Sequence, residues 1–415
     1  MTEQPADPPA DQRWNRRRLR SNNEWLLLER LRTAGPASRA QLARDTGLSK
    51  PTVSAALAAL EQVGLAREAG TVAPDRGRTA VLYEADPTAG YVLGVDIGRA
   101  WLRLAVADLA GTVVAREDVP NRGRSGSAVA ESVLAAAGRV TAAAGLQRGD
   151  IVEAVVGAPG VFDEQTGRVR YAVNLPGWGR SGLVAGMREG LGTSLTLHND
   201  ANLAAIGEYA CGAGRDSRLF VYILIGTGLG MGVVADGELF RGAHGAAGEI
   251  GFLPLLTNPM PPGPSPVQGA PRRGTLEDAV SGEAVVRGAR ELGMTGPQEH
   301  PQAHPLTAKQ VFEAAREGVP AAVAAVRQEG ERLAHVVAAV SSVLDPDLVV
   351  LGGGVGHSAD LLLQTVQDTL DLLTPLRPRV APSELGDDAV LLGAITTALR
   401  SARPKVFDTH NAAAQ

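Results

Sequence analysis

The chain has 415 residues, of which 44% are hydrophobic and 20% charged, the balance of a globular protein with several domains. A single cysteine, Cys211, excludes an intramolecular disulfide and any metal site built from several thiolates. The sequence has no apolar run of about 18 residues and no secretory signal, so we expect a soluble cytoplasmic protein without a membrane partner.

Charge is unevenly distributed along the chain, although the net charge is only −5. Residues 1–85 carry 13 Lys+Arg against 10 Asp+Glu, whereas the remainder carries 27 against 35. Part of the basic excess is a run of arginines that can neutralise phosphates, formed by Arg13, Arg16, Arg17, Arg18 and Arg20. The same run is equally typical of a solvated tail. Because residues 1–20 show no apolar period, we predict a flexible basic arm.

The first predicted helix follows this arm. Trp25, Leu28 and Leu31 recur at three-residue steps, and Gly35-Pro36 ends the pattern. A second helix is predicted directly after the first, because Ser38 and Gln41 have the spacing of a capping box and Gly47 can end the helix in a tight turn.

A third helix completes the pattern helix, helix, tight turn, helix. Ser49 can cap it, and Pro51 lies in its first turn, where a missing N–H is harmless. Its apolar residues face one side until Gly64; they are Val53, Leu57 and Leu60. Residues 65–70 and 79–85 then alternate with period two around a turn marked by Pro74-Asp75 and Gly77, which predicts a β-hairpin.

This order predicts a winged helix-turn-helix over residues 21–86 that binds double-stranded operator DNA. Small polar side chains at the start of the third helix can reach base edges or phosphates, and arginines at the hairpin tip can enter the minor groove. The predicted DNA-binding residues are Gln41, Ser49, Lys50, Thr52, Ser54, Arg76 and Arg78. Alanines at 55, 58 and 59 leave the exposed helix face nearly bare. Specificity therefore requires a homodimer or homotetramer on a divided operator, because one good base contact supplies about 1–3 kcal/mol.

A mixed α/β body begins at residue 90. Three β-rich runs between 91 and 119 precede an Ala-rich helix at 125–145 and a strand at 151–158. Residues 219–240 repeat the strand, glycine turn, strand pattern, which indicates a body duplicated into two lobes. Helices are expected at 321–344 and 359–373, with a strand at 347–354 between them. A proline-rich loop is expected at 257–275, and a loose tail at 401–415.

Glycine-rich segments follow three of the predicted strands in the body. They are Asp96-Ile97-Gly98, Gly226-Thr227-Gly228-Leu229-Gly230 and Gly352-Gly353-Gly354. Such segments expose backbone N–H groups that can hold phosphates, although each alone is as typical of a tight turn.

With the sequences APGVFD, NLPGW, HNDAN and LIGTGLGMGVVADGELFRGAHGAAGEIG, these segments resemble the ROK family of sugar kinases and sugar-responsive repressors. The resemblance implies an α/β fold in which a winged helix-turn-helix precedes a two-lobed, actin-like (RNase H-like) domain at about 90–400. Lobe one would comprise about 90–198 plus a C-terminal helix at about 388–400, and lobe two about 199–387. The whole chain is similar to the regulators of the family, of the xylose and N-acetylglucosamine repressor type.

The resemblance also implies a sugar site. Asn199 and Asp200 match the pair that bonds sugar hydroxyls, and Asp200 would be the general base in a kinase. Glu249 and Glu277 match two further contacts, and Gly160 would let the backbone approach the sugar. The pair at 199–200 is also what a simple helix N-cap would look like. Trp178 could stack on a sugar, but a core position is the better interpretation.

Two departures from the family pattern bear on activity and cofactors. Kinases continue the first phosphate loop as Asp-x-Gly-Gly-Thr-Lys, whereas this chain has Arg99, Ala100 and Trp101 after Gly98, which disfavours productive nucleotide binding. The family's structural zinc site is predicted absent, because its histidine position is Phe252 and its three cysteines are missing. His244 lies nearby, but one histidine does not make a replacement site.

The sequence therefore predicts a repressor whose operator affinity is controlled by a monosaccharide or sugar derivative, without enzymatic activity and without a cofactor. One alternative is an ATP-dependent sugar kinase with a fused DNA-binding domain, which Asp200 permits. Another is a regulator whose pocket is vestigial and which senses a partner protein, which Phe252 favours.

Overall fold

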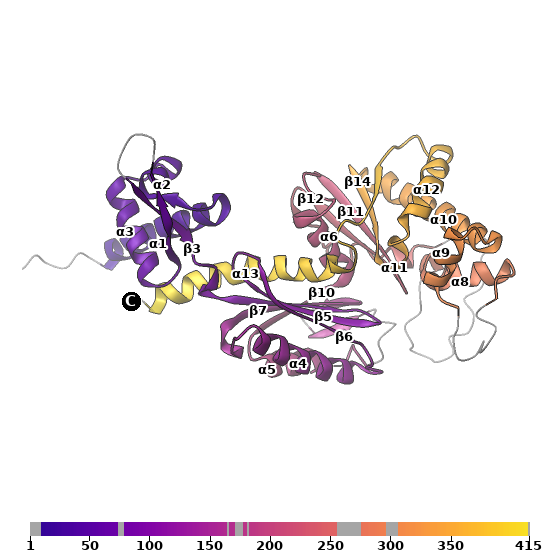
Figure 1. Cartoon of the computed structure of the whole chain (residues 1–415), viewed down its shortest axis with the longest axis horizontal. Helices are drawn as coiled ribbons and strands as arrows, with labels where there is room; N and C mark the ends of the chain where they lie inside the picture. Colours follow the sequence, from indigo (N-terminus) through magenta and orange to yellow (C-terminus); the bar gives the residue numbers. More distant parts are fainter. Residues whose placement is uncertain are drawn as a thin grey trace, which may run out of the picture.

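In the computed structural model, the described residues are 10–73, 79–163, 166–170, 177–180, 182–254, 275–295 and 306–413. They form a small head joined by a neck to a body of two lobes (Figure 1). None of the helices in these ranges is long and apolar enough to cross a membrane.

The head is a three-helix unit with a small antiparallel sheet ordered β1-β3-β2. Its elements are α1 Ala10–Ala34, β1 Ala37–Ser38, α2 Arg39–Thr46, α3 Lys50–Gln62, β2 Ala66–Val72, β3 Ala80–Ala85 and the 3-10 helix η1 Pro87–Ala89. The predicted caps are confirmed: Ser38 Oγ accepts a hydrogen bond from Gln41 N at 3.3 Å, and Gly47 ends α2 at φ 72°. The predicted core residues of α3, Val53, Leu57 and Leu60, are fully buried.

Lobe one is a five-stranded sheet ordered β10-β7-β4-β5-β6 with two helices on one face. Its strands are β4 Tyr91–Ile97, β5 Trp101–Asp108, β6 Val113–Pro120, β7 Ile151–Ala158 and β10 Ser194–Asn199. The other elements are α4 Gly126–Ala143, η2 Arg148–Asp150, the hairpin β8 Val161–Asp163 and β9 Arg168–Arg170, and α5 Leu183–Leu191. Trp178 is buried in this core, as the sequence predicted.

The sheet of lobe two is ordered β13-β12-β11-β14-β15. Read from β15, its strands follow the same order by position in the chain as those of lobe one, namely fifth, fourth, first, second and third, which confirms the duplication. Its strands are β11 Leu219–Ile225, β12 Leu229–Ala235, β13 Glu238–Leu239, β14 Leu348–Gly352 and β15 Arg379–Pro382. Its helices are α6 Asp200–Cys211, η3 Ile250–Phe252, α7 Thr275–Ala279, α8 Gly282–Glu291, α9 Ala308–Arg316, α10 Pro320–Leu344, α11 Gly353–Gly356, α12 Ala359–Leu373 and η4 Gly386–Asp388. The predicted proline-rich loop lies almost wholly outside the described residues.

Two helices fill the space between the sheets. α6 packs against β11 and β12 of lobe two, and α13, Ala389–Ala413, packs against β4 and β7 of lobe one. The two helices also pack on each other, at glycines: a Cβ at Gly393 would overlap Leu203 O, and a Cβ at Gly207 would overlap Ala389 O. The close crossing of α6 and α13 therefore depends on both residues lacking a side chain.

Two predictions about the chain ends are wrong. Residues 10–20 were expected in a flexible arm but form the first turns of α1, because no glycine or proline follows Pro9 until Gly35 and arginine is a good helix former. Residues 401–413 were expected in a loose tail but continue α13 through Pro404. The apolar side chains of Val406 and Phe407 pack into the head core, and this burial offsets the hydrogen bond that Pro404 cannot donate.

Candidate functional site: a DNA-reading head and an inter-lobe cleft

The start of α3 carries the predicted DNA-binding side chains on the surface of the head. Ser49, Lys50 and Ser54 are exposed, while Gln41 and Thr52 are partly exposed. Ser49 also has a structural role, because its Oγ accepts the N–H of Thr52 at 3.3 Å and lies 2.7 Å from Thr52 Oγ1. The helix start thus offers backbone N–H groups, hydroxyls and one ammonium to an anionic partner.

The wing is described only in part. Strands β2 and β3 pair antiparallel as expected, with a register shift between Glu68 and Thr71. Arg76 and Arg78, the predicted minor-groove contacts, lie outside the described residues, so their assignment stays a prediction.

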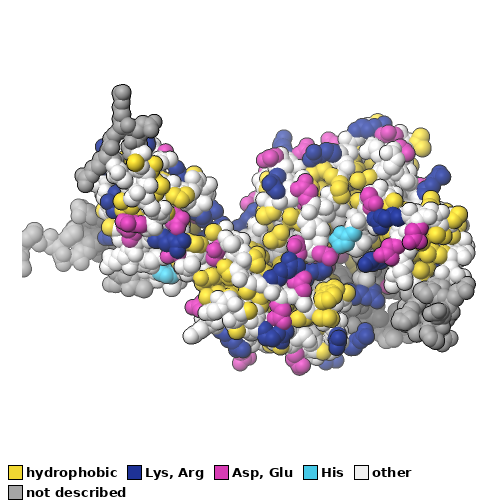
Figure 2. Space-filling view, in the orientation of Figure 1, with side chains coloured by type: hydrophobic (Ala, Val, Ile, Leu, Met, Phe, Trp, Pro, Cys, Tyr) yellow, Lys and Arg dark blue, Asp and Glu magenta, His cyan; other side chains and the backbone are white. Residues whose placement is uncertain are grey.

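A cleft of about 1810 Å³ separates the two lobes and is lined by both. Figure 2 shows acidic and basic side chains side by side where the lobes meet. The predicted sugar residues all line this cleft; they are Gly160, Asn199, Asp200, Glu249 and Glu277. The structure therefore gathers residues that are up to 117 positions apart, counted from Gly160 to Glu277, into one cavity.

Asn199 and Asp200 lie where β10 ends and α6 begins. Asn199 is the N-cap, since its Oδ1 accepts the N–H of Asn202 at 3.1 Å, and its Nδ2 donates to Gly160 O at 3.3 Å. Asp200 uses one oxygen to accept the N–H of Ala201 at 2.9 Å. Burial raises the pKa of Asp200 above its usual range, so this carboxyl gains from a hydroxyl donor that would replace water.

Glu249 and Glu277 lie near Asp200 in the same cleft. Burial raises the pKa of Glu249 to about 7, and the charges of Asp200 and Glu277 add to the effect. Three carboxyls in electrostatic reach of one another form a strong acceptor set for several hydroxyl donors.

Two arginine side chains form ion pairs at the first glycine-rich segment of the cleft, Asp96-Ile97-Gly98. Arg103 lies 3.3 Å from Asp96 and 3.0 Å from Asp387, and it connects β5 of lobe one to η4. Burial raises the pKa of Asp96 to about 7, against the opposing charge of Arg103. Arg99 reaches across the cleft to Glu283 on α8, with 3.4 Å between Nη1 and Oε1. Trp101 is 44% exposed and lines the same cleft.

Sequence reasoning missed Arg103, Asp387 and the end of α13. The pairing of Arg103 with Asp387 joins positions 284 apart, which no local spacing can reveal. The end of α13 had a signal, because Leu399, Ala402 and Val406 continue an apolar helical stripe past Ala389.

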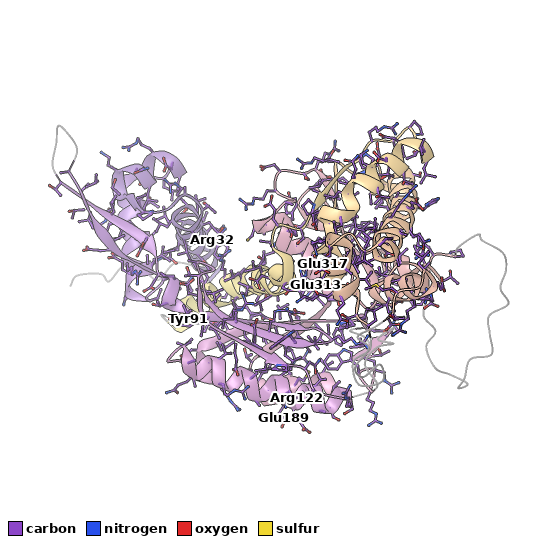
Figure 3. The ribbon with its side chains drawn as sticks, turned by 45° about the vertical axis from the view of Figure 1, so that its right-hand side comes forward. Arg32, Tyr91, Arg122, Glu189, Glu313 and Glu317 are labelled. Carbon is purple, nitrogen blue, oxygen red and sulfur yellow. The ribbon has the colours of Figure 1, made fainter. Side chains whose placement is uncertain are left out.

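The head and body meet at a neck built around α13 (Figure 3). The rings of Trp25 and Phe407 lie edge to face with centroids 5.0 Å apart. Arg403 donates from Nε and Nη2 to Leu109 O at 3.1 and 2.8 Å, and burial lowers its pKa to about 10, with Arg32 of the head adding to the shift.

Comparison with known proteins places this architecture in a family. The sequence profile of the ROK family matches residues 92–401, three quarters of the chain. The chain belongs to the ROK family. The profile of the MarR family matches residues 21–67, within the DNA-binding head.

The relatives of this ROK protein differ in which domains they share with it. A glucokinase from Halalkalibacterium halodurans is 31% identical over 320 residues, which cover 73% of this chain and 93% of the glucokinase. A xylose repressor from Caldicellulosiruptor bescii is 24% identical over 386 residues, which cover 91% of this chain and 95% of the repressor. The match to the repressor is longer because it includes the head, which indicates a transcriptional regulator.

A solved structure supports the same overall fold. A ROK family transcriptional regulator, described as a homologue of the E. coli MLC protein, superposes with a TM-score of 0.71 at 22% identity. The superposition covers 94% of this chain and 99% of that one, so the fold similarity extends through head and body.

The structural zinc of the family does not fit the donors in this chain. The histidine position is Phe252, which is 43% exposed in the cleft, and the one cysteine, Cys211, lies on α6. Among the described residues, no group of three or more His, Cys, Asp or Glu could hold a metal ion.

Proposed function

We propose that this protein is a transcriptional repressor whose affinity for operator DNA is controlled by a sugar bound in the inter-lobe cleft. The observation that carries the proposal is α13, a single helix of 25 residues with one end at the cleft and the other in the head. Val390 lines the cleft, while Val406 and Phe407 belong to the hydrophobic core of the head. A rigid element thus spans the distance between the two sites.

The sugar side of this connection begins at Asp200. Its helix, α6, crosses α13 at the glycine pair Gly207 and Gly393, where the backbones are in direct contact. A ligand that moves Asp200 within the cleft therefore displaces α13 by packing alone, because interiors at native density transmit a shift.

The head side is fixed by contacts of several kinds. Lys405 pairs with the buried carboxylate of Glu153 on β7, and Arg403 is bonded to the β5–β6 turn. A rotation of lobe one therefore carries this end of α13 with it and changes the position of the head, and with it the separation of two heads in an oligomer.

We further propose that the cleft binds the sugar without transferring phosphate. Arg103 forms an ion pair with Asp96 inside the cleft. Arg99 and Trp101 occupy the loop that in family kinases is glycine, threonine and lysine. A magnesium-bound nucleotide would have to displace the contact of Arg99 with Glu283 and would meet the bulky side chains of Arg99 and Trp101 where it needs open backbone N–H groups.

The oligomer is part of the proposal. A homodimer or homotetramer would place two α3 helices on neighbouring half-sites of the operator. Helix α10 and the segment of α7 and α8 are the candidate contacts between subunits, and Val343 at the end of α10 is 83% exposed.

Fluorescence anisotropy on DNA from upstream of the protein's own gene, titrated with monosaccharides and their phosphates, tests the function. We expect one sugar to change operator affinity by about 5–150-fold, which corresponds to about 1–3 kcal/mol of coupling. Operator binding that no sugar alters would contradict sugar control and favour a protein effector.

A coupled ADP-release assay with the same sugars tests the kinase alternative. We expect no turnover. Turnover that disappears in Asp200→Asn would show that the protein is a kinase with a fused head.

A further inference from the structure

The cleft carboxylate Glu277 lies on a helix that is too short to hold its own position. Helix α7 has five residues, and isolated helices below about 12–15 residues are marginal in water. The segment 255–274 before it lies outside the described residues. In the ROK family the structural zinc holds this region, and the donors of that site are missing from this chain. Other contacts therefore have to fix Glu277 in the cleft.

The first of these contacts is made by Thr275. In the family's zinc-binding run, the last cysteine lies two residues before the glutamate that Glu277 matches, and Thr275 takes that position. Thr275 Oγ1 donates a hydrogen bond to Leu253 O at 3.0 Å. Leu253 directly follows Phe252, which takes the histidine position of the same zinc site. One hydrogen bond therefore joins the two segments that zinc joins in the family.

The same two segments pack on each other beside the cleft. Ile250 of η3 and Leu276 of α7 belong to one hydrophobic core cluster. A Cβ at Gly251 would come within 3.3 Å of Glu277 Cβ, so the backbone of η3 lies directly against this side chain. Because Glu249 is the N-cap of η3, the contact of η3 with α7 sets the separation of Glu249 and Glu277.

The second contact holds the other end of α7. Arg287 on α8 donates a hydrogen bond from Nη2 to the backbone oxygen of Asp278. This oxygen is among the last carbonyl groups of the helix, which have no partner inside the helix itself. Asp278 directly follows Glu277, so the guanidinium holds the turn that carries the cleft carboxylate. Arg287 and Glu277 both line the cleft.

We propose that Thr275 and Arg287 are positioning residues that hold Glu277 in the sugar cleft, as a metal-free replacement for the structural zinc of the family. The inference rests on the proposed binding of a sugar in this cleft. It predicts that sugar affinity depends on the two hydrogen bonds through Glu277 and does not depend on a bound metal.

Calorimetric titration of the full-length protein tests the inference. The probes are a panel of monosaccharides and their phosphates, which includes D-glucose, D-xylose and N-acetyl-D-glucosamine. The probe that wild type binds most tightly is then titrated into each variant. A second wild-type sample is dialysed against EDTA, and Zn²⁺ is added back to part of it.

The variants separate the hydrogen bonds from the size of the side chains. Thr275→Val removes the hydroxyl at nearly constant volume, Thr275→Ser keeps the hydroxyl, and Arg287→Met removes the donor but keeps a long side chain. Thr33→Val is the matched control, because Thr33 is exposed and its Oγ1 also donates to a backbone oxygen, Glu29 O at 2.7 Å, in the head. Circular dichroism and thermal unfolding check that each variant is folded.

We expect Thr275→Val and Arg287→Met each to weaken sugar binding by about 2- to 12-fold, the effect of losing one hydrogen bond. Thr275→Ser and Thr33→Val should bind as wild type does. In a Glu277→Ala background, measured at a higher protein concentration, the two substitutions should cause no further loss, because both act through this carboxylate. EDTA should leave the wild-type affinity unchanged.

Four results would contradict the inference in distinguishable ways. Wild-type affinity in both Thr275→Val and Arg287→Met would refute the positioning role and leave the sugar site in place. An equal loss in the Glu277→Ala background would show that these residues do not act through Glu277. Sugar binding lost with EDTA and restored by Zn²⁺ would show that a metal holds the segment. Wild-type protein that binds no sugar of the panel would remove the proposed sugar site together with the inference.

Discussion

Asp200 and Asn199 have different structural roles, although the sequence presents them as one pair. Asn199 fulfils the capping alternative, because its Oδ1 accepts the N–H of Asn202 and its Nδ2 fixes Gly160. Asp200 accepts the N–H of Ala201 with one oxygen and also lines the cleft. The interpretation of the pair as a simple helix N-cap therefore holds for Asn199 and does not account for Asp200.

Replacing Asp200 with alanine should separate sensing from DNA binding. Operator affinity in the absence of ligand should stay within about twofold of wild type, because Asp200 lines the inter-lobe cleft and is not part of the core of the head. The response to the sugar should disappear. Anisotropy with and without ligand measures both quantities, with Asp368→Ala, an exposed carboxylate on α12, as the matched control. A full response in Asp200→Ala would place the sugar site elsewhere.

The raised pKa of Glu249 predicts that sugar binding depends on pH near neutrality. A sugar hydroxyl donates to the ionised carboxylate, so affinity should be highest above the pKa of about 7 and fall as the pH drops below it. The fall should not exceed about tenfold per pH unit for one proton. Asp200 and Glu277 share this environment, and Asp96, with a pKa also near 7, is held by Arg103.

Titration calorimetry at about pH 6, 7 and 8 provides the measurement for this dependence. The variant Glu249→Gln should flatten the profile, and any slope that remains belongs to Asp200 or Asp96, whose pKa values are also raised by burial. A wild-type profile without slope would mean that Glu249 does not accept a hydrogen bond from the ligand.

At the scale of whole elements, local signals predicted the head better than the chain ends. The caps at Ser38 and Ser49 and the buried spacing of α3 are local, so the sequence identified α2 and α3 with nearly correct limits, whereas α1 begins well before its predicted start. The prediction of a flexible arm for residues 10–20 was wrong. A charged segment without an apolar face can still be helical when the helix is anchored by packing further along the chain.

The candidate sugar site shows the same division between local and long-range information. The motifs around Asp200 and Glu249 predicted the residues that line the cleft, because each is fixed by its own strand end or turn. The cations that close the phosphate loop were not predicted, because the contacts of Arg103 with Asp387 and of Arg99 with Glu283 form only when distant segments pack.

Phe407 should be the critical residue of α13 for coupling. Its side chain is 4% exposed and packs on Trp25, and replacing a buried phenylalanine with alanine costs about 3–5 kcal/mol. We expect Phe407→Ala to loosen the docking of the head, so that the sugar still binds but no longer changes operator affinity. Leu372→Ala, at an 88% exposed position on α12, is the control.

Two measurements distinguish uncoupling from unfolding in this variant. Calorimetric scans should show a separate early transition of the head, and sugar affinity should stay at the wild-type value. Unchanged coupling in Phe407→Ala, with the early transition present, would rule out α13 as the connection between the sites.

At the scale of the whole molecule, the cleft contacts and the neck belong to one mechanical unit. Arg103 and Arg116 of lobe one pair with Asp387 and Asp388, the residues that lead directly into α13. A change in lobe separation therefore reaches the first turn of α13 through ion pairs and its last turns through the head core. Exposed ion pairs contribute only about 0–1 kcal/mol each, so these contacts orient the lobes more than they stabilise them.

Because one helix joins the two sites, their coupling has to be reciprocal. If the sugar weakens operator binding by a given factor, bound operator weakens sugar binding by the same factor, since both measure one difference in free energy between two states. We expect calorimetric titrations of the sugar into free protein and into the operator complex to differ by the factor found from anisotropy. In Phe407→Ala both factors should return to one together. Unequal factors in the wild type would mean that sugar and operator binding are linked to a third step, the association of subunits, which depends on protein concentration. The sugar would then act by changing the oligomer rather than the conformation.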